Sequence, residues 1–309
     1  MADFLEKSKR YKVAGHIFEV SQGICEGFFA KFMDNYAPFV VDESSDVASA
    51  SNLFAIKVEH SDEMPQYNED VCQDEEGQQI HCGSIGEKAV FDFRLRGELT
   101  GMLICSKDYK EASLLIPNGT SFNLLKFAVN NSLMVLYAIA SASCYTLLFH
   151  SAVVNYHGKG YMFLGKSGTG KSTHARLWLK YNEGSELLND DNPVVRFFKD
   201  GENSYARVYG SPWSGKTPCY KNEDYPLGGF VLLAQAPFNE IKRLRGVMAY
   251  AAIVPHISGK RWESVIADGL HKTENLLAMN VPIWHLDCLP DEGAAKLCVA
   301  NIAQDKKGP

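Results

Sequence analysis

The stretch that decides the fold runs from Gly165 to Thr173 and reads Gly-Lys-Ser-Gly-Thr-Gly-Lys-Ser-Thr. It satisfies the pattern G-x-x-x-x-G-K-[ST] at every position, and this pattern is typical of a loop that binds phosphate groups. Glycines let backbone N–H groups approach anionic oxygens, and a helix that begins at the loop directs its positive end at the same oxygens. The residues predicted to bind the phosphates are Gly165, Ser167, Gly168, Thr169, Gly170, Lys171, Ser172 and Thr173.

Two side chains of this P-loop, or Walker A motif, have specific roles in phosphoryl transfer. Lys171 is expected to reach the β- and γ-phosphates of ATP, and the Ser172 hydroxyl is expected to bind Mg²⁺. The context agrees, because the apolar run Tyr161–Leu164 precedes the loop and the amphipathic segment Ala175–Leu179 follows it. A glycine-rich turn without a ligand would not require this context.

Two adjacent carboxylates, Asp190 and Asp191, follow Lys171 by 19 and 20 residues. They stand after the apolar pair Leu187-Leu188, at the expected end of a strand. One acid can hold Mg²⁺, and the other can accept a proton from an attacking hydroxyl. An Asp/Asn/Pro turn without function also suits this composition. The P-loop upstream favours the functional interpretation.

The close spacing of the P-loop and the acid pair resembles the kinase domain of HPr kinase/phosphorylase and the nucleotide domain of phosphoenolpyruvate carboxykinase. In both families a histidine on the preceding strand stands where His150 stands here, 15 residues before Gly165. The resemblance covers roughly residues 146 to 236. It implies that Asp190 is a general base, that Asp191 contacts Mg²⁺, and that His150 lies near the metal. Without this context, a histidine at a strand end is usually a hydrogen-bonded core or edge residue.

A closer resemblance is to stand-alone HPr-kinase-like proteins, which share runs similar to Leu187–Pro193 and Tyr209–Lys216. In the second run, small residues flank Trp213, and Lys216 ends the run. A flexible loop with a cation can close over phosphates during transfer, which makes Lys216 a candidate catalytic residue. Trp213 could then cover an adenine or a substrate. A turn with a buried tryptophan and a solvated lysine is an equal alternative.

Three further features near these motifs receive structural interpretations. His157 is expected in a solvated turn, and His174 on the outer face of the helix that follows the P-loop. Arg243 and Arg245 are expected to form a solvated surface pair. The acidic stretch from residue 61 to 83 contains no Lys or Arg. It favours a solvated hairpin over a docking or cation-binding loop.

The pattern of apolar residues predicts two domains, residues 1–145 and 146–309. The first half contains short runs rich in β-branched and aromatic residues, followed by a helix expected over residues 122–142. The second half alternates strands and helices, which is typical of an α/β domain. Together with the family resemblance, this implies a P-loop nucleotide domain of the HPr-kinase and carboxykinase type, preceded by a β-rich domain. The expected strands of the first half are Tyr11–Val20, Leu53–His60, Ala89–Arg96, Leu99–Ser106 and Ala112–Pro117.

The composition is ordinary for a globular protein, with 46% hydrophobic and 22% charged residues in 309. It excludes a disordered chain, a collagen and a small disulfide scaffold. The net charge of −6 argues against non-specific nucleic-acid binding. Eight cysteines without a CxxC pair, and a start without an apolar leader, favour the cytoplasm.

The uncharged stretch 127–149 is long enough for a membrane span. Its polar residues favour a buried helix and strand instead.

These features together predict a kinase that uses ATP and Mg²⁺ to phosphorylate a hydroxyl of a small molecule, peptide or protein. Lys171 and Lys216 would neutralise the charge that develops on the transferred group. One alternative is a carboxykinase that forms phosphoenolpyruvate from oxaloacetate. Another is a nucleotide-sensing module with little turnover. The expected partners are a nucleotide and an acceptor, without nucleic acid or membrane, and a homo-oligomer remains open.

Overall fold

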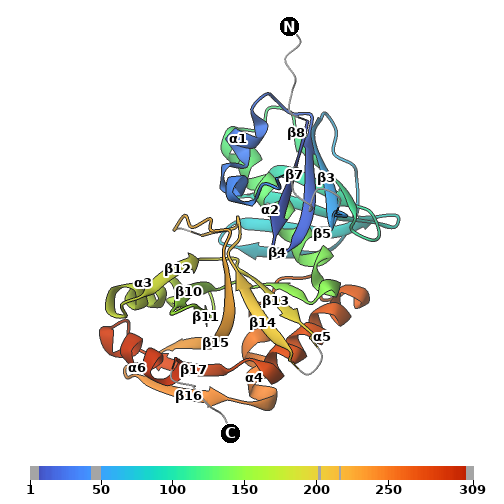
Figure 1. Ribbon diagram of the computed structural model, residues 1–309. Helices are drawn as coiled ribbons and strands as arrows, with labels where there is room; N and C mark the ends of the chain where they lie inside the picture. The colour runs from blue at the N-terminus through green and yellow to red at the C-terminus, as the bar shows by residue number, and fades with distance from the viewer. Residues whose placement is uncertain (1–6, 43–49, 201–202, 216, 304–309) are drawn as a thin grey trace. The chain divides into compact units, whose positions relative to one another are not determined.

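The structure is a computed structural model that describes residues 7–42, 50–200, 203–215 and 217–303 (Figure 1). The chain forms two compact units, Met1–Ala140 and Ser141–Pro309. The division falls close to the boundary expected between residues 145 and 146. The first unit is rich in strands, and the second combines a sheet with helices. This confirms the mixed α/β content expected from the sequence.

The first unit is built on an eight-stranded sheet with the order β1-β2-β3-β8-β7-β6-β5-β4. The pairs β2–β3 and β3–β8 are parallel, and the other neighbours are antiparallel. The strands are β1 (Ser8–Val13), β2 (His16–Gln22), β3 (Phe54–Ser61), β4 (Asn68–Glu75), β5 (Gln78–Ile85), β6 (Lys88–Leu95), β7 (Glu98–Cys105) and β8 (Glu111–Pro117).

The single strand predicted over Tyr11–Val20 was wrong, because this segment is the hairpin of β1 and β2. The chain reverses at Ala14 and Gly15, which have φ values of 48° and 81°. An Ala-Gly turn inside an apolar run gives little signal in composition. The acidic stretch does form the expected hairpin, β4 and β5, and most of β4 is exposed.

The long helix α2 (Phe122–Ala140) packs against strands of the first unit's sheet, mainly β7. Gly101 on β7 permits this approach, since a Cβ there would lie 3.0 Å from the Ala128 Cβ. By length and composition α2 is the one helix in the described residues that could cross a membrane, and half of its apolar window is buried inside the fold. This packing agrees with the interpretation as a buried helix. The other helices of this unit are α1 (Phe28–Phe32) and the 3₁₀ segment η1 (Asp34–Phe39).

The second unit is built on a nine-stranded sheet. Its main path is β12-β10-β11-β15-β14-β13-β9, and β17 pairs with both β15 and β16. The pairs β11–β15 and β15–β17 are parallel. The strands are β9 (Thr146–Leu148), β10 (Ala152–Tyr156), β11 (Lys159–Leu164), β12 (Ser185–Asn189), β13 (Val194–Phe198), β14 (Tyr205–Tyr209), β15 (Asp224–Gln235), β16 (Glu240–Leu244) and β17 (Ile283–Cys288).

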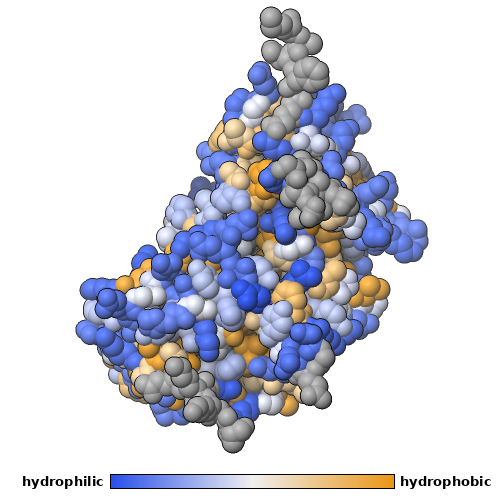
Figure 2. Space-filling model, viewed as in Figure 1, coloured by the Kyte–Doolittle hydropathy of each residue, from blue (hydrophilic) through white to orange (hydrophobic). Residues whose placement is uncertain are grey.

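The helices of the second unit cover its sheet. Helices α3 and α6 contact each other, and their buried residues share one core with Phe163, Val231 and Leu286. Helix α4 contacts β15 and β17, and α5 contacts β9 and β13. The helical segments are η3 (Ala142–Cys144), α3 (Lys171–Tyr181), α4 (Gly246–Ile253), η4 (Val254–His256), α5 (Ser264–Asn280) and α6 (Glu292–Ile302). On the face seen in Figure 2, apolar residues are scattered among hydrophilic ones, which is normal for a protein surface.

Candidate active site

The sheet brings the P-loop and the acid pair to the same edge. Strand β10 pairs antiparallel with both β11 and β12, so β11 and β12 run parallel and end at that edge. Val153 of β10 lies between Met162 of β11 and Asn189 of β12 in register. Since neighbouring strands are about 4.8 Å apart, β11 and β12 are separated by about 10 Å. The P-loop follows β11, and the acid pair follows β12.

The P-loop connects β11 to the first residue of α3, as the motif predicts. Gly168 and Gly170 have φ values of 77° and 108°, in the region that favours glycine. The Thr169 hydroxyl donates a hydrogen bond of 2.7 Å to the Lys166 carbonyl, which stabilises the turn. Lys171 Nζ donates to the Gly165 carbonyl at 3.0 Å. The ammonium group therefore lies over the loop that would hold the phosphates.

The remaining predicted phosphate-binding side chains lie at the start of α3 and on the loop. Ser172 and Thr173 occupy the first turn of α3 and are partly exposed, and Ser167 is exposed. Hydroxyl groups in these places remain accessible to a ligand. The first turn of a helix also leaves backbone N–H groups without intrahelical partners. The sequence motif thus adopts a local structure suited to an anion.

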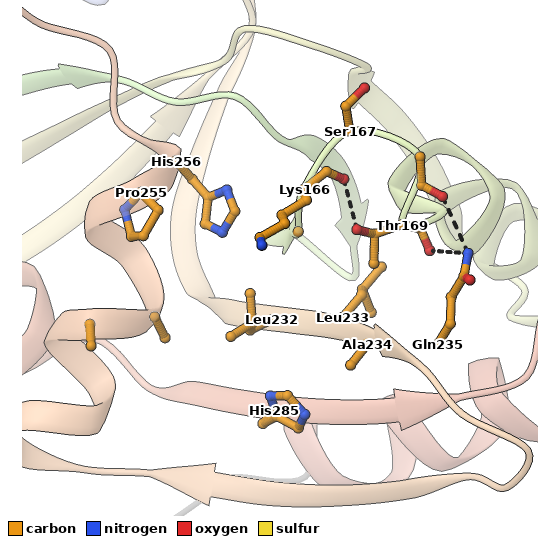
Figure 3. A pocket seen from close by; sticks show the side chains of 14 residues that line it. Lys166, Ser167, Thr169, Leu232, Leu233, Ala234, Gln235, Pro255, His256 and His285 are labelled. Atoms are coloured by element: carbon orange, nitrogen blue, oxygen red, sulfur yellow. Dashed lines mark hydrogen bonds between the residues drawn. The ribbon is translucent and has the colours of Figure 1, made fainter.

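A cavity of about 590 Å³ borders the P-loop (Figure 3). Figure 3 shows the Lys166 side chain extending toward the His256 ring, and Gln235 beside the turn at Thr169. Gln235 Nε2 donates to the Gly168 carbonyl at 3.2 Å and approaches the Thr169 carbonyl at 3.4 Å. The side of the cavity opposite the loop is mostly apolar. The lining residues beyond the P-loop are Leu232, Leu233, Ala234, Gln235, Ala251, Ala252, Pro255, His256 and His285.

His150 contacts the acid pair directly. Its Nδ1 lies 3.0 Å from Asp191 Oδ1, and the two side chains are 41% and 30% exposed. The Asp191 carbonyl accepts a hydrogen bond of 2.8 Å from the Ser151 N–H, while its own N–H donates to Asn189 Oδ1 at 2.9 Å. The main chain and one carboxylate oxygen of Asp191 are therefore held in place. Asp191 Oδ2 remains available for another partner.

Asp190 is buried, with 7% of its surface exposed. Its Oδ1 atom is buried and has no hydrogen-bond partner in the described part of the chain. A buried carboxylate oxygen without a partner is costly and calls for an explanation. Gly215 approaches the pair closely, since a Cβ there would lie 3.1 Å from the Asp190 carbonyl oxygen. An unpartnered oxygen of this kind suits a binding site in which a ligand supplies the missing hydrogen bond.

The segment around Trp213 supports the acid pair through its main chain. Asn189 Nδ2 donates to the Trp213 carbonyl and to Ser211 Oγ, both at 3.2 Å. The Ser211 hydroxyl in turn donates to the Asn192 carbonyl at 2.6 Å. The Trp213 side chain is only 4% exposed, so the alternative with a buried tryptophan describes this segment. Lys216 lies outside the described residues, and its role stays a prediction.

Comparison with known proteins gives little beyond this geometry. No protein-family model matches the chain. No curated protein matches it. A solved structure that matches is the HPr(Ser) kinase/phosphatase from Coxiella burnetii, with 12% identity and a TM-score of 0.30 over 50% of this chain and 94% of that one.

The structure corrects the expected position of His174. The prediction of an outer-face histidine was wrong, because His174 is buried and accepts a hydrogen bond of 3.1 Å from Trp178 Nε1. Burial lowers the pKa of His174 to about 4. His157 lies in an exposed turn, as expected, and Arg243 and Arg245 are exposed. None of these four residues contributes to the lining of the P-loop cavity.

Sequence reasoning missed His256, Gln235 and His285. Burial, with smaller contributions from the charges of Lys171 and His150, lowers the pKa of His256 to about 4. The His256 carbonyl also accepts a hydrogen bond of 2.7 Å from the His150 N–H. Gln235 had a usable signal, because it directly follows the apolar run Gly229–Ala234, and ligands bind at the carboxyl ends of strands in α/β sheets. His256 had none, since the turn after α4 places it there.

The residues of this edge fit a magnesium–nucleotide complex. Among the residues that the structure describes, no group of three or more His, Cys, Asp or Glu side chains forms a metal site. Mg²⁺ usually takes only one or two carboxylates in such sites and completes its shell with phosphates and water. The donors present here are the Ser172 hydroxyl and the Asp190–Asp191 pair. The unpartnered Asp190 oxygen indicates that a ligand completes this end of the sheet.

Proposed function

We propose that the second unit is a kinase that transfers the γ-phosphoryl group of ATP to a hydroxyl of an acceptor, with Mg²⁺ as cofactor. One observation carries the proposal: the P-loop and the Asp190–Asp191 pair leave parallel strands on either side of β10. A nucleotide phosphate and a carboxylate base must meet within a few ångströms for this reaction. The motifs that resemble HPr kinases support the same assignment.

The P-loop would hold the triphosphate. Its glycines give the phosphate oxygens access to backbone N–H groups, and the N-terminus of α3 adds a favourable dipole. Lys171 would leave the Gly165 carbonyl, which is a weaker partner than a phosphate oxygen, and bind the β- and γ-phosphates. Gln235 would keep the loop in shape through its bond to the Gly168 carbonyl.

Ser172 and Asp191 would hold Mg²⁺, which supplies positive charge to the β- and γ-phosphate oxygens when bound. The contact with His150 occupies Asp191 Oδ1 and so orients the carboxylate. His150 would then act on the metal ligand rather than on the substrate. Such an outer partner is common for ligands of metal sites, where it fixes the orientation of the ligand.

Asp190 would accept the proton of the acceptor hydroxyl. Its orphaned Oδ1 is buried beside Asp191, and a hydroxyl donor would satisfy it. The acceptor would be a small molecule, a peptide or a protein. Lys216, the residue after Gly215 in the sequence, would add positive charge during transfer.

Transfer of label from γ-³²P-ATP into a metabolite and protein extract tests the function. Wild type is compared with Asp190→Asn, Lys171→Ala and the control Asp268→Asn, which changes an exposed aspartate on α5. We expect label with wild type and the control, and none with the other two. Nucleotide binding should survive in Asp190→Asn and weaken in Lys171→Ala.

Two results would contradict the kinase assignment. Tight ATP binding without any label transfer or ADP production indicates a nucleotide-sensing module. Formation of ADP that depends on oxaloacetate, or formation of ATP that depends on phosphoenolpyruvate, indicates a carboxykinase. Addition of excess chelator provides the metal control, since it should abolish transfer and excess Mg²⁺ should restore it.

A further inference from the structure

A second group of reactive side chains lies in the first unit, on the hairpin of β4 and β5. Cys72 of β4 pairs in register with His81 of β5, which pairs with Asp92 of β6. Since residues directly opposite each other on paired strands point to the same face, these three side chains lie on one face of neighbouring strands. This face is buried at Asp92, which is 1% exposed, and becomes accessible toward the outer strand at Cys72.

The cysteine, the histidine and a glutamate form a chain of contacts. Cys72 Sγ lies 3.6 Å from His81 Nε2, and His81 Nδ1 lies 3.1 Å from Glu69 Oε2. Cys72 is exposed, whereas the His81 side chain is only 17% exposed. The imidazole therefore lies between an accessible thiol and a carboxylate, and its approach to the carboxylate is a close charge contact without hydrogen-bond geometry. A nucleophile, a base and an orienting group in this order are the parts of an activated nucleophile.

The arrangement suits proton transfer rather than metal binding. Cys72 and Glu69 contact opposite nitrogens of the His81 ring, so the three groups do not converge on one point. A metal site needs its donors to point at a common ion. A ring that receives a proton at Nε2 becomes positively charged, and the nearby Glu69 carboxylate stabilises this charge. The pair then becomes a thiolate beside an imidazolium.

The charges around Cys72 make its reactivity depend on His81. The carboxylates on β4 and β6 repel a bare thiolate, whereas a thiolate–imidazolium pair has no net charge. Asp74 and Asp92 are engaged in hydrogen bonds with Gln79 and Arg94. The titratable or charged groups on or beside this face are Tyr67, Glu69, Asp70, Asp74, His81, Asp92 and Arg94.

The other seven cysteines lack this combination. Burial raises the pKa of the Cys219, Cys288 and Cys298 thiols, which makes them poorer nucleophiles. Cys72 is the exposed cysteine among the eight, all of which the structure describes. The buried or half-buried ones are Cys25, Cys82, Cys105, Cys144, Cys219, Cys288 and Cys298.

We propose that Cys72 is a modification site that undergoes thiol–disulfide exchange with small, positively charged disulfides. His81 accepts the thiol proton, and the Cys72 thiolate attacks one sulfur of the disulfide. The disulfide's S–S bond breaks, a new S–S bond joins Cys72 to one half, and the other half leaves as a thiolate. His81 returns its proton to that leaving group, so protons and electrons balance. The acidic surroundings favour a cationic disulfide over an anionic one.

Cystamine, a cationic disulfide, and oxidised glutathione, an anionic one, are the probes. The full chain is treated with each at pH 6 to 9, and the adduct is located by peptide mass spectrometry. We expect a single fast adduct at Cys72 with cystamine, formed about tenfold faster at pH 7 than with a free cysteine peptide. The reaction with oxidised glutathione should be clearly slower.

Three variants identify the source of the reactivity. Cys72→Ser should remove the fast adduct, and His81→Gln should slow it about tenfold. Glu69→Gln should keep the adduct but move its rise in rate to higher pH, because the imidazolium loses its carboxylate partner. His60→Gln is the matched control, since His60 is exposed on β3 of the same sheet.

Two outcomes would overturn the proposal. One is a wild-type rate equal to that of the peptide at every pH. The other is a fast adduct with the same rate and pH profile in wild type, His81→Gln and Glu69→Gln. If a variant fails to fold, the comparison of the wild-type rate with the peptide rate across the pH range still tests the proposal. ATP is absent throughout, so failure here says nothing about phosphoryl transfer.

Discussion

His150 and Asp191 form a contact of 3.0 Å between Nδ1 and Oδ1, while the His150 N–H binds the carbonyl of His256. The side chain thus orients a predicted metal ligand, and the main chain fastens the turn that lines the cavity. His150 therefore contacts both Asp191 and His256, which are 65 residues apart in the sequence.

Replacing His150 should separate these roles. We expect His150→Ala to lower kcat about ten- to a hundredfold with little change in the affinity for ATP, because the P-loop is untouched. The requirement for Mg²⁺ should rise, since Asp191 loses its orienting partner. Steady-state kinetics at several Mg²⁺ concentrations measure both effects. An unchanged Mg²⁺ dependence would contradict the positioning role.

The unpartnered oxygen of Asp190 predicts that replacing this residue abolishes activity without lowering stability. Asp190→Asn changes a buried carboxyl group that has one oxygen without a hydrogen-bond partner among the described residues, so the free energy of unfolding should stay equal or rise by about 1 kcal/mol. Phosphoryl transfer should disappear in the same variant. Urea unfolding and the label-transfer assay give the two readouts. A large loss of stability would show that the carboxylate has a structural role instead.

His174 should make the protein less stable in mild acid. Its pKa is about 4 in the fold, below the ordinary 6.5, so the unfolded chain binds the proton first as pH falls. The contribution of His174 to the free energy of unfolding is complete above about pH 6.5. It is lost progressively between about pH 6.5 and pH 4, by about 3 kcal/mol in total. His174→Gln keeps an acceptor for Trp178 and should reduce this loss. Urea unfolding at pH 7 and pH 4.5, compared between the two proteins, isolates the contribution of His174 from other groups.

Gln235 should influence nucleotide affinity from outside the motif. Gln235→Ala removes the hydrogen bond to the Gly168 carbonyl, and a bond of this kind contributes about 1 kcal/mol. We expect a Kd for ATP that is up to about fivefold higher, and a melting temperature lower by a few degrees at most, because the bond already exists in the unliganded protein. Isothermal titration calorimetry measures this. Asn239→Ala, at an exposed turn contact with Asp291, serves as the comparison and should leave the Kd unaltered.

Local patterns in the sequence predicted much of the second unit. The run Tyr161–Leu164 and the glycines that follow led to β11 and the start of α3, because chain geometry there depends on neighbours in sequence. The hairpin turn at Ala14 carried too weak a local signal. The burial of His174 depended on Trp178 and on Phe163, whose ring lies 4.8 Å from its own. Such packing is a tertiary property that no local pattern encodes.

The candidate site shows the same limit. The P-loop and the acid pair could be predicted, because each is a short run with a chemical reason for its composition. His256 could not, since a turn after α4 brings it to the cavity from a segment without a motif. The orphaned oxygen of Asp190 and the contact of His150 with Asp191 also required coordinates. The order of the strands in the sheet determines which residues lie together where β11 and β12 end.

The position of β10 between β11 and β12 has a consequence for how this protein can change over evolution. The separation of the P-loop from the acid pair is set by two rows of backbone hydrogen bonds, which do not depend on side-chain identity. Substitutions in the wall of the cavity, at Leu232, Ala251 or His285, can therefore change which ligands the cavity admits, while the spacing between the P-loop and the acid pair is kept.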